Sequence, residues 1–203
     1  NVLARELGID SRSPEAIVNA IMAQTPRMAS LGLANVRGFS MMAGVGFDAH
    51  VVANVNTRVK RVIGKFAYVV ASLIELVRYR ARTYRVEIGG RTEIASSVVV
   101  ANGRLYGGPY IIASRASLDD DQFQVCLFRR TGRWNAMRYM WGLVSGRLTR
   151  FPDFDIITAR YLQITAGELC SAREPVQGDG DVMTILPVEL EVREIGIPVM
   201  RPV

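Results

Sequence analysis

The sequence predicts an α+β fold that is mainly an antiparallel β-sandwich with inserted helices. Strand-like segments dominate the chain after a helical start. The helices interrupt these strands and do not alternate with them, as they would in a doubly wound parallel sheet. A length of 203 residues with 49% hydrophobic residues provides for a sizeable core and excludes a disordered or collagen-like chain. We expect one large domain, or one domain with part of a second.

Helices are expected at the start and in the middle of the chain. Residues 1–8 form the first turns of one helix, and Ser13-Pro14-Glu15 begins another that runs to about Ala23. The longest helical pattern covers residues 56–82, with basic residues at both ends. A further helix over residues 134–144 carries four apolar side chains on one face: Trp134, Met137, Trp141 and Val144.

The rest of the chain is expected to form strands. Residues 26–34 are interpreted as a loop. The glycines of Gly89-Gly90 predict a hairpin turn between two strands. The expected strands cover residues 36–43, 84–88, 93–101, 122–128, 156–166, 183–186 and 189–192.

The charge balance is basic, because 25 Lys and Arg residues stand against 19 Asp and Glu residues, a net charge of +6. Such a charge fits a nucleic acid or an anionic membrane surface. Nucleic acid is disfavoured, because aromatic residues are not interleaved with the basic clusters as stacking platforms would require. No apolar run reaches the 18 residues typical of a membrane-spanning helix.

Several chemistries are excluded or disfavoured by composition. His50 is the only histidine, which excludes an HExxH metalloprotease and multi-histidine metal sites. Cys126 and Cys170 lack CxxC spacing, and we interpret them as buried thiols in a reducing cytoplasm. The chain starts at Asn1 without a signal-peptide pattern, so we expect a fragment or a trimmed chain.

Four glycine- or acid-rich motifs carry alternative interpretations. Gly44-Val45-Gly46-Phe47-Asp48-Ala49 imitates a dinucleotide fingerprint, but a strand-to-helix turn with Asp48 capping it or positioning a ligand is favoured. Asp119-Asp120-Asp121 is either a solvated turn or a Mg²⁺ site. Residues 177–181, Gln-Gly-Asp-Gly-Asp, form a hairpin turn or present carboxylates to a ligand or a hydroxyl proton. Residues 102–108 form a plain loop or line a pocket.

The longest predicted helix also has two interpretations. The apolar face of the helix over residues 56–82 packs on the sheet or borders a cleft that admits lipid.

Taken in order, these segments resemble the diacylglycerol kinase catalytic family, which includes bacterial lipid kinases and sphingosine kinases. The order of six pieces over nearly the whole chain makes the resemblance specific. Those pieces are residues 1–9 (end of G-T-x-N-D-x-A-R), Gly46-Phe47-Asp48-Ala49 (G-F-D-A), residues 64–68 (G-K-x-x-Y), Asn102 with Gly107-Gly108 (N-G-x-x-x-G-G), residues 113–125 (A-P-x-A-x-x-x-D-G-x-x-x-V) and Asp179-Gly180-Asp181 (D-G-E).

The resemblance implies a two-lobe, ATP-dependent lipid kinase that phosphorylates a hydroxyl of diacylglycerol or a sphingoid lipid at the inner membrane face. This chain would be mostly its β-sandwich second lobe, with remnants of an α/β nucleotide-binding lobe. Residues 1–29 would end the nucleotide-binding lobe, 30–189 would form the lipid-substrate lobe, and 190–203 would return to the first lobe. A homodimer is compatible with this organisation.

The resemblance also implies roles for individual residues. Asp181 would take the place of the proton-accepting glutamate, with Asp179 beside it as the second carboxylate. Asp120 would hold a structural Mg²⁺ together with the backbone carbonyls of Ser117 and Gln122. Asn1 would contact the nucleotide.

The sequence departs from the family pattern at four positions. Asp121 stands in place of glycine, Asp181 in place of glutamate, Val2 in place of aspartate and Ser114 in place of proline. The first two bear on the metal site and the rate, and the other two on lobe contacts and loop rigidity. The family's G-G-D-G-T phosphate-binding segment is expected before Asn1, so we expect this chain alone to be inactive. The alternative from a different class is a non-catalytic lipid-binding or interaction domain.

Overall fold

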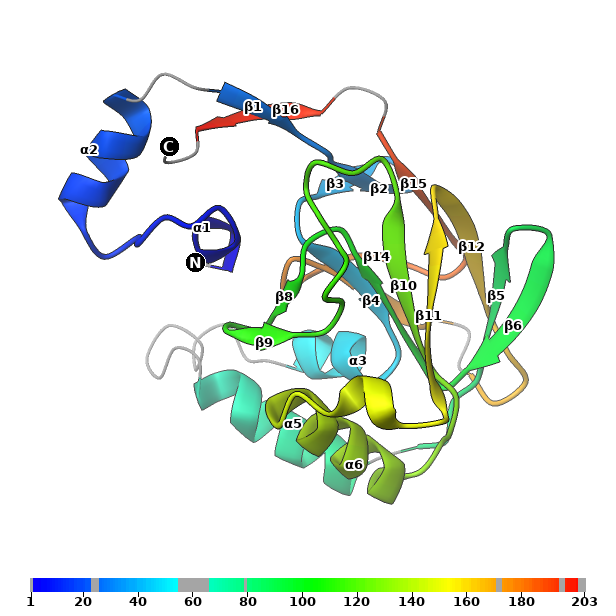
Figure 1. Cartoon of the computed structure of the whole chain (residues 1–203). Coiled ribbons are helices and arrows are strands. Elements are labelled where there is room, and N and C mark those ends of the chain that lie inside the picture. The colour runs from blue at the N-terminus through cyan, green and yellow to red at the C-terminus, as the bar shows by residue number, and fades with distance from the viewer. Residues whose placement is uncertain are drawn as a thin grey trace.

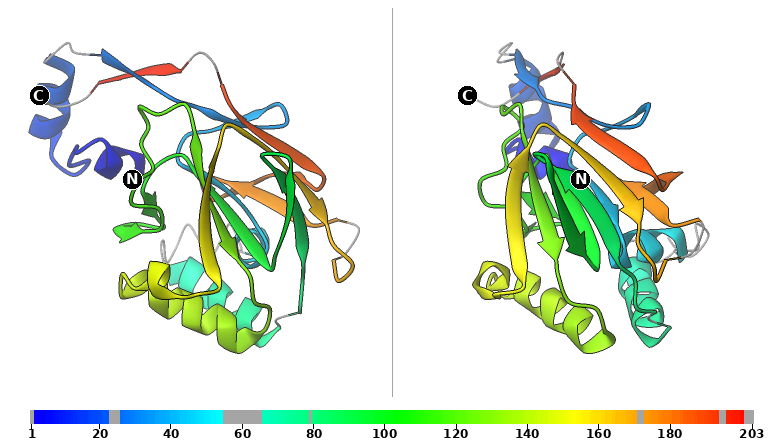
Figure 2. Two further views of the ribbon diagram at one scale, coloured as in Figure 1. Left: turned by 45° about the vertical axis from the view of Figure 1, so that its right-hand side comes forward. Right: turned by 90° about the vertical axis from the view of Figure 1, so that its right-hand side faces the viewer.

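The computed structural model describes residues 2–22, 26–54, 66–78, 80–170, 173–193 and 196–200, and for residues 66–70 it describes the backbone only. Two six-stranded antiparallel sheets form the main body of the described chain, and they pack against each other in both views of Figure 2. The expected α+β fold with an antiparallel sandwich is confirmed.

The first sheet carries the candidate site at one end of its strand order. All its strand pairs are antiparallel. Its order is β11 (Phe154–Ala159), β10 (Phe123–Phe128), β7 (Ser97–Ala101), β4 (Met42–Val45), β13 (Pro175–Gly178) and β14 (Asp181–Ile185).

The second sheet closes the sandwich from the other side. Its order is β3 (Arg37–Phe39), β2 (Gly32–Ala34), β15 (Val188–Val192), β12 (Tyr161–Ala166), β5 (Tyr84–Ile88) and β6 (Arg91–Ala95). Two short sheets complete the described strands: β1 (Pro26–Ala29) pairs with β16 (Ile197–Met200), and β8 (Leu105–Tyr106) pairs with β9 (Tyr110–Ile111).

Helices cover two regions outside the sandwich. Short helices α1 (Val2–Glu6) and α2 (Pro14–Met22) lie with β1 and β16 at the upper left of Figure 1. Helices α3 (Phe47–Asn54), α5 (Phe66–Val77) and α6 (Arg133–Val144) lie together at the lower end, and a single 3-10 turn, η1 (Leu148–Arg150), follows α6. No helix in the described ranges is long and apolar enough to cross a bilayer.

The first sheet is buried on both faces because alternate side chains enter two different cores. Val98 and Val100 of β7 join the core between the sheets, whereas Val99 packs on the outer face with Cys126. Because both faces of the sheet are buried, the sequence of β7 is a nearly continuous apolar run. Cys126 is a buried free thiol as expected, but Cys170 is only partly buried.

Several element boundaries differ from the expectations. Residues 26–34 were expected to be a loop, but they form β1 and β2, whose partners β16 and β15 lie at the other end of the chain. Three expected single strands each break in two: residues 36–43 at Ser40, residues 93–101 at Ser96 and residues 156–166 at Arg160. At all three breaks the chain passes from one sheet to the other.

Each expected helix is observed at least in part, but the one expected over residues 56–82 ends earlier than predicted. Ser13 caps α2, since its Oγ accepts a hydrogen bond from the Ala16 amide at 3.1 Å. Gly89 and Gly90 both have positive φ, at 56° and 75°, and close the expected hairpin between β5 and β6. Of the helix expected over 56–82, α5 is observed. It ends at Val77, and residues 80–82 are not helical. Residues 55–65, which include the motif residues Gly64 and Lys65, lie outside the described residues.

Candidate active site

The turn between β13 and β14 is held to the start of β4 by the side chain of Asp179. Its Oδ2 accepts hydrogen bonds from the Ser40 amide at 2.7 Å and the Ser40 hydroxyl at 2.8 Å. Its Oδ1 accepts bonds from the amides of Met41 at 2.9 Å and Met42 at 3.0 Å. A single carboxylate therefore binds three consecutive backbone amides and fixes the turn against the sheet.

The same turn presents Asp181. Asp179 has φ of 51° and Gly180 has φ of 91°, as expected for a two-residue Asp-Gly hairpin loop. Gly178 and Asp181 are paired across this loop. Asp181 is exposed at the first position of β14. The hairpin interpretation and the carboxylate-presenting interpretation are thus both compatible with the observed geometry.

Asp48 is connected to the turn through Gln177. The Gln177 amide Nε2 donates to Asp48 Oδ2 at 2.9 Å, and Gln177 Oε1 accepts a bond from the Gly180 amide at 3.1 Å. Asp48 lies in the first turn of α3, directly after β4. Burial raises the pKa of Asp48 from 3.8 to about 6, and hydrogen bonding with Tyr106 and Gln177 opposes part of this shift.

We expect Asp48→Asn to change how stability depends on pH. Between pH 4 and 6 Asp48 keeps its proton in the folded protein but releases it in the unfolded chain. The unfolding free energy of the wild type therefore falls as the pH rises through this range. A difference of about two pKa units corresponds to about 3 kcal/mol. The difference in unfolding free energy between Asp48→Asn and wild type should therefore shift by about 2 kcal/mol in favour of the variant between pH 4 and pH 7. Urea unfolding of both proteins at both pH values measures it. An equal difference at both would contradict the assignment.

Asn102 connects the turn to the acidic loop over residues 117–122. This side chain is fully buried, and its Nδ2 donates to the carbonyls of Ser40 at 2.8 Å and Ser30 at 3.0 Å. The Ser30 hydroxyl donates to Asn102 Oδ1 at 3.0 Å, and the Ser30 amide donates to the Leu118 carbonyl at 2.6 Å. Asn102 and Asp179 thus both contact Ser40, and the chain of bonds reaches the acidic loop.

The acidic loop forms a tight turn. The Asp120 amide donates to the Ser117 carbonyl at 3.1 Å, and the Asp119 amide donates to Ser117 Oγ at 3.1 Å. Asp121 forms an ion pair with Arg160 at 2.7 Å. Both partners are more than half exposed, so the pair contributes little to stability, but the guanidinium compensates the charge that Asp121 adds beside Asp120.

The donor set of this loop fits a hard cation. A carboxylate at Asp120 and carbonyls at Ser117 and Gln122 are oxygen ligands of the kind that Mg²⁺ takes together with several waters. Within the described ranges, no group of three or more His, Cys, Asp and Glu side chains is arranged to hold a metal ion. Asp120 would therefore be the main protein charge at such a site.

Other residues around the site were missed by the sequence interpretation. Glu6 of α1 binds the loop after β7, since its carboxylate accepts bonds from the amides of Arg104 and Leu105, both at 3.2 Å, and from Arg104 Nε at 3.0 Å. Gln177 lies inside a quoted motif but carried no expected role. Asn1 lies outside the described residues, so its expected nucleotide contact is not observed.

The fold and the site define a β-sandwich domain with an acidic hairpin at one edge of its doubly buried sheet. The chain belongs to the family described as the YegS C-terminal NAD kinase beta sandwich-like domain, because residues 41–201 match that family. This membership confirms the resemblance to the diacylglycerol and lipid kinases.

Two relatives of this chain are named as diacylglycerol or lipid kinases. The chain is 25% identical over 207 residues to the "Diacylglycerol kinase" of Mycobacterium tuberculosis (strain H37Rv), across 98% of this chain and 65% of the relative. It is 30% identical over 130 residues to the "Probable lipid kinase YegS-like" of Pseudomonas aeruginosa (strain UCBPP-PA14), across 63% of this chain and 42% of the relative. The chain thus spans about two thirds of the length of the first relative and less than half of the second.

A solved structure supports the fold. "Crystal structure of a putative diacylglycerol kinase from Bacillus anthracis str. Sterne" superimposes with a TM-score of 0.76 at 18% identity. The match covers 99% of this chain and 65% of that chain. At this identity the likeness concerns the fold.

Proposed function

We propose that this chain is the lipid-substrate lobe of a kinase that transfers the γ-phosphoryl group of ATP to the hydroxyl of diacylglycerol or a related sphingoid lipid. One observation carries the proposal. The hairpin between β13 and β14 presents Asp181 and is fixed to β4 by the hydrogen bonds of Asp179, in a chain whose residues 41–201 belong to this family. We further propose that residues 1–29 and the chain beyond β15 belong with the nucleotide-binding lobe. The boundary expected at residue 190 falls inside β15, which is a strand of the second sheet. The pairing of β1 with β16, outside the sandwich, supports this division.

In this proposal Asp181 is the general base and Asp179 is a positioning residue. The oxygens of Asp179 already accept four hydrogen bonds, so this carboxylate has little remaining capacity to take a proton. Asp181 is exposed where a substrate can reach it. It accepts the lipid hydroxyl proton while the hydroxyl oxygen forms a bond to the γ-phosphorus, and the bond from that phosphorus to the bridging oxygen breaks to release ADP.

ATP binding is assigned to the lobe that precedes this chain in the proposed parent protein. We therefore expect the 203-residue chain to show no ATP turnover, whereas a chain extended N-terminally by that lobe phosphorylates diacylglycerol. Comparing the two proteins with the same lipid and ATP tests this division. Turnover by the short chain alone, or none by the folded extended chain with ATP bound, would overturn it.

The acidic loop is proposed as a structural Mg²⁺ site formed by Asp120 and the carbonyls of Ser117 and Gln122. Bound Mg²⁺ would supply positive charge that fixes this loop. We expect Mg²⁺ at about ten times its dissociation constant to stabilise the chain by about 1.4 kcal/mol and Asp120→Asn to lose this effect. Thermal unfolding of wild type and variant with Mg²⁺ measures it, and Glu168→Gln, an exposed acid on another loop, is the control. An equal Mg²⁺ shift in Asp120→Asn and wild type would contradict the site.

A second candidate function is a non-catalytic lipid-binding or interaction domain. It is favoured by the aspartate at position 181, which is one methylene shorter than the family's glutamate. In the extended protein, unchanged lipid binding with lost turnover in the Asp181→Asn variant supports the kinase. Lipid binding without turnover in the wild type supports the binding domain.

A further inference from the structure

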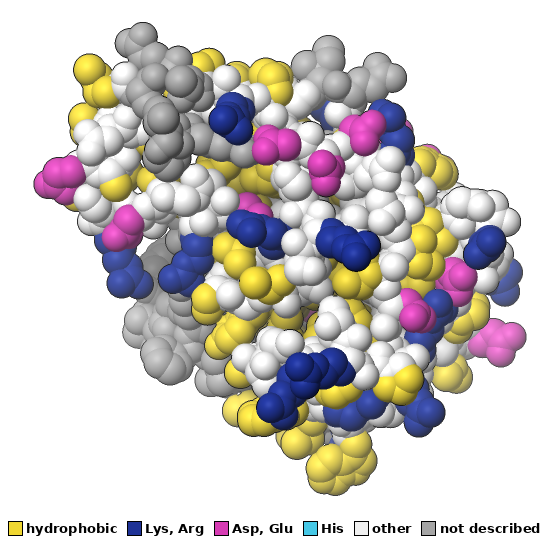
Figure 3. Space-filling model, viewed as in Figure 1, with side chains coloured by type: hydrophobic (Ala, Val, Ile, Leu, Met, Phe, Trp, Pro, Cys, Tyr) yellow, Lys and Arg dark blue, Asp and Glu magenta, His cyan; other side chains and the backbone are white. Residues whose placement is uncertain are grey.

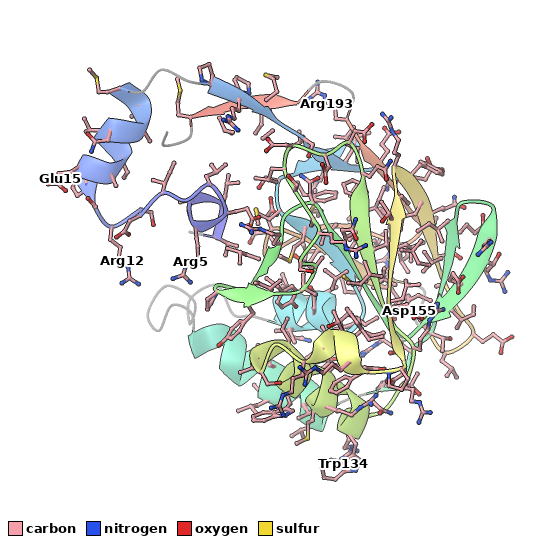
Figure 4. All side chains as sticks on the ribbon, viewed as in Figure 1. Arg5, Arg12, Glu15, Trp134, Asp155 and Arg193 are labelled. Atoms are coloured by element: carbon pink, nitrogen blue, oxygen red, sulfur yellow. The ribbon has the colours of Figure 1, made fainter. Side chains whose placement is uncertain are left out.

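Helix α6 has two apolar faces, of which only one is buried in the described structure. Tyr139 and Gly142 are buried, and Leu143 packs on the outer core of the first sheet. The opposite face carries Trp134, Met137, Trp141 and Val144. Trp134 is 75% exposed and Trp141 is 64% exposed, and Figure 4 shows Trp134 projecting from the lower end of the molecule.

The neighbouring helix α5 carries further exposed apolar residues. It contacts α6, and the two helices lie side by side in both Figure 1 and Figure 2. Its exposed residues Leu73, Ile74 and Val77 line a shallow groove together with Arg78. We define the helical apolar surface as seven exposed residues: Leu73, Ile74, Val77, Trp134, Met137, Trp141 and Val144.

Arginines outnumber acidic residues around this surface. Three of them, Arg129, Arg130 and Arg138, are paired with acids outside α6. Residues 122–152 contain no Asp or Glu, whereas residues 129–152 contain six arginines. Arg133, Arg147 and Arg150 are exposed and, within the described chain, form no ion pair. Figure 3 shows apolar and basic side chains together at the lower end of the molecule. Glu75, the acid of α5, is buried and paired with Arg82.

We propose that the helical apolar surface docks on an anionic phospholipid bilayer. Tryptophan is favoured at membrane interfaces, and the flanking arginines are attracted to anionic headgroups. A second copy of this chain fits less well, because a two-fold interface would bring the arginines of both copies to one another. The reason for such docking rests on the proposed function, because a lipid kinase must reach a hydroxyl held in a membrane. The evidence for the surface is independent of that function and consists of the exposed apolar and basic residues.

Trp134 and Trp141 are the only tryptophans of the chain, so its intrinsic fluorescence reports on this surface directly. We expect the tryptophan emission of the 203-residue chain to shift to shorter wavelength with vesicles of phosphatidylcholine containing one third phosphatidylglycerol. Phosphatidylcholine alone should give a much smaller shift. Raising the salt from about 0.1 M to 1 M shortens the Debye length from about 10 Å to 3 Å and should weaken the binding.

Variants separate the apolar and the basic contributions. By vesicle sedimentation, the double variant Trp134→Ala/Trp141→Ala should bind at least tenfold more weakly. Arg133→Gln and Arg147→Gln should each bind about fivefold more weakly. The matched control is Ile94→Ala, an exposed apolar residue on β6, which should bind like wild type. Circular dichroism checks that each variant is folded.

Three outcomes would overturn the proposal: an emission unchanged by anionic vesicles, equal binding by the tryptophan double variant, or a dimer in light scattering that the double variant abolishes. The binding measurement uses neither ATP nor a lipid acceptor. Vesicle binding without kinase activity in the extended protein would therefore reject the proposed function and leave this surface intact, and activity without vesicle binding would reject the surface alone.

Discussion

Replacing Asp181 with asparagine is expected to lower kcat by about 10²- to 10⁴-fold in the protein extended by its nucleotide-binding lobe. A general base contributes about this factor when it accepts a proton in the transition state, and asparagine cannot accept it. The exposed position of Asp181 means that the substitution should leave the unfolding free energy nearly unchanged. Initial rates of lipid phosphorylation at saturating ATP and lipid measure the effect.

Two further variants sharpen this test. Asp181→Glu restores the residue of the family pattern and should keep most of the activity, because its carboxylate can still accept the proton. Asp179→Asn should lower stability as well as rate, since Asp179 holds the turn through three backbone amides. Asp181→Asn with near wild-type kcat would show that Asp181 is not the base.

Replacing Glu174 with alanine is expected to destabilise the protein by about 3–5 kcal/mol. Glu174 is only 2% exposed, and its Oε2 lies 2.7 Å from His50 Nε2, 2.8 Å from the Tyr84 hydroxyl and 3.7 Å from Arg82 Nε. Removing Glu174 leaves His50 and the buried Tyr84 hydroxyl without this partner, although Arg82 keeps its ion pair with Glu75. Breaking a buried ionic network in this way costs about this amount. Urea unfolding at neutral pH measures the loss.

The matched control is Glu168→Ala. Glu168 is an exposed glutamate on the loop before Glu174, and its replacement should change the unfolding free energy by no more than about 0.5 kcal/mol. A loss below about 1 kcal/mol in Glu174→Ala would show that solvent reaches the network. Because β13 begins at Pro175, the strand that leads to the Asp179 turn starts beside this network.

The sequence predicted those elements whose signals are local. The alternation of Tyr84–Ile88, the glycines at 89 and 90 and the cap at Ser13 each act within a few residues of the structure they specify. Strand β1 was missed because it is four residues long and pairs only with β16, more than 150 residues away. Strand β2 has a local partner in β3 as well as the distant β15, but it is only three residues long. Corners such as Arg160 were missed because a strand that changes sheets keeps its β pattern.

The candidate site was predictable as a set of motifs but not as a network. Asp179 is 137–139 residues away from the amides that it binds, so no local pattern shows that its oxygens are already engaged. Helical periodicity likewise identified the Trp134 face of α6 without showing that it is solvent-exposed, because both faces of that helix are apolar. The burial that raises the pKa of Asp48 also depends on residues from distant strands.

The most direct test of the central claim is the transfer of labelled γ-phosphate from ATP to a panel of diacylglycerol, monoacylglycerol and sphingoid lipids, with the chain extended by its nucleotide-binding lobe. We predict label on the hydroxyl of at least one of these lipids, and its loss in the Asp181→Asn variant. An unlabelled panel, obtained with folded protein that binds ATP, would contradict the assignment of this chain to a working lipid kinase.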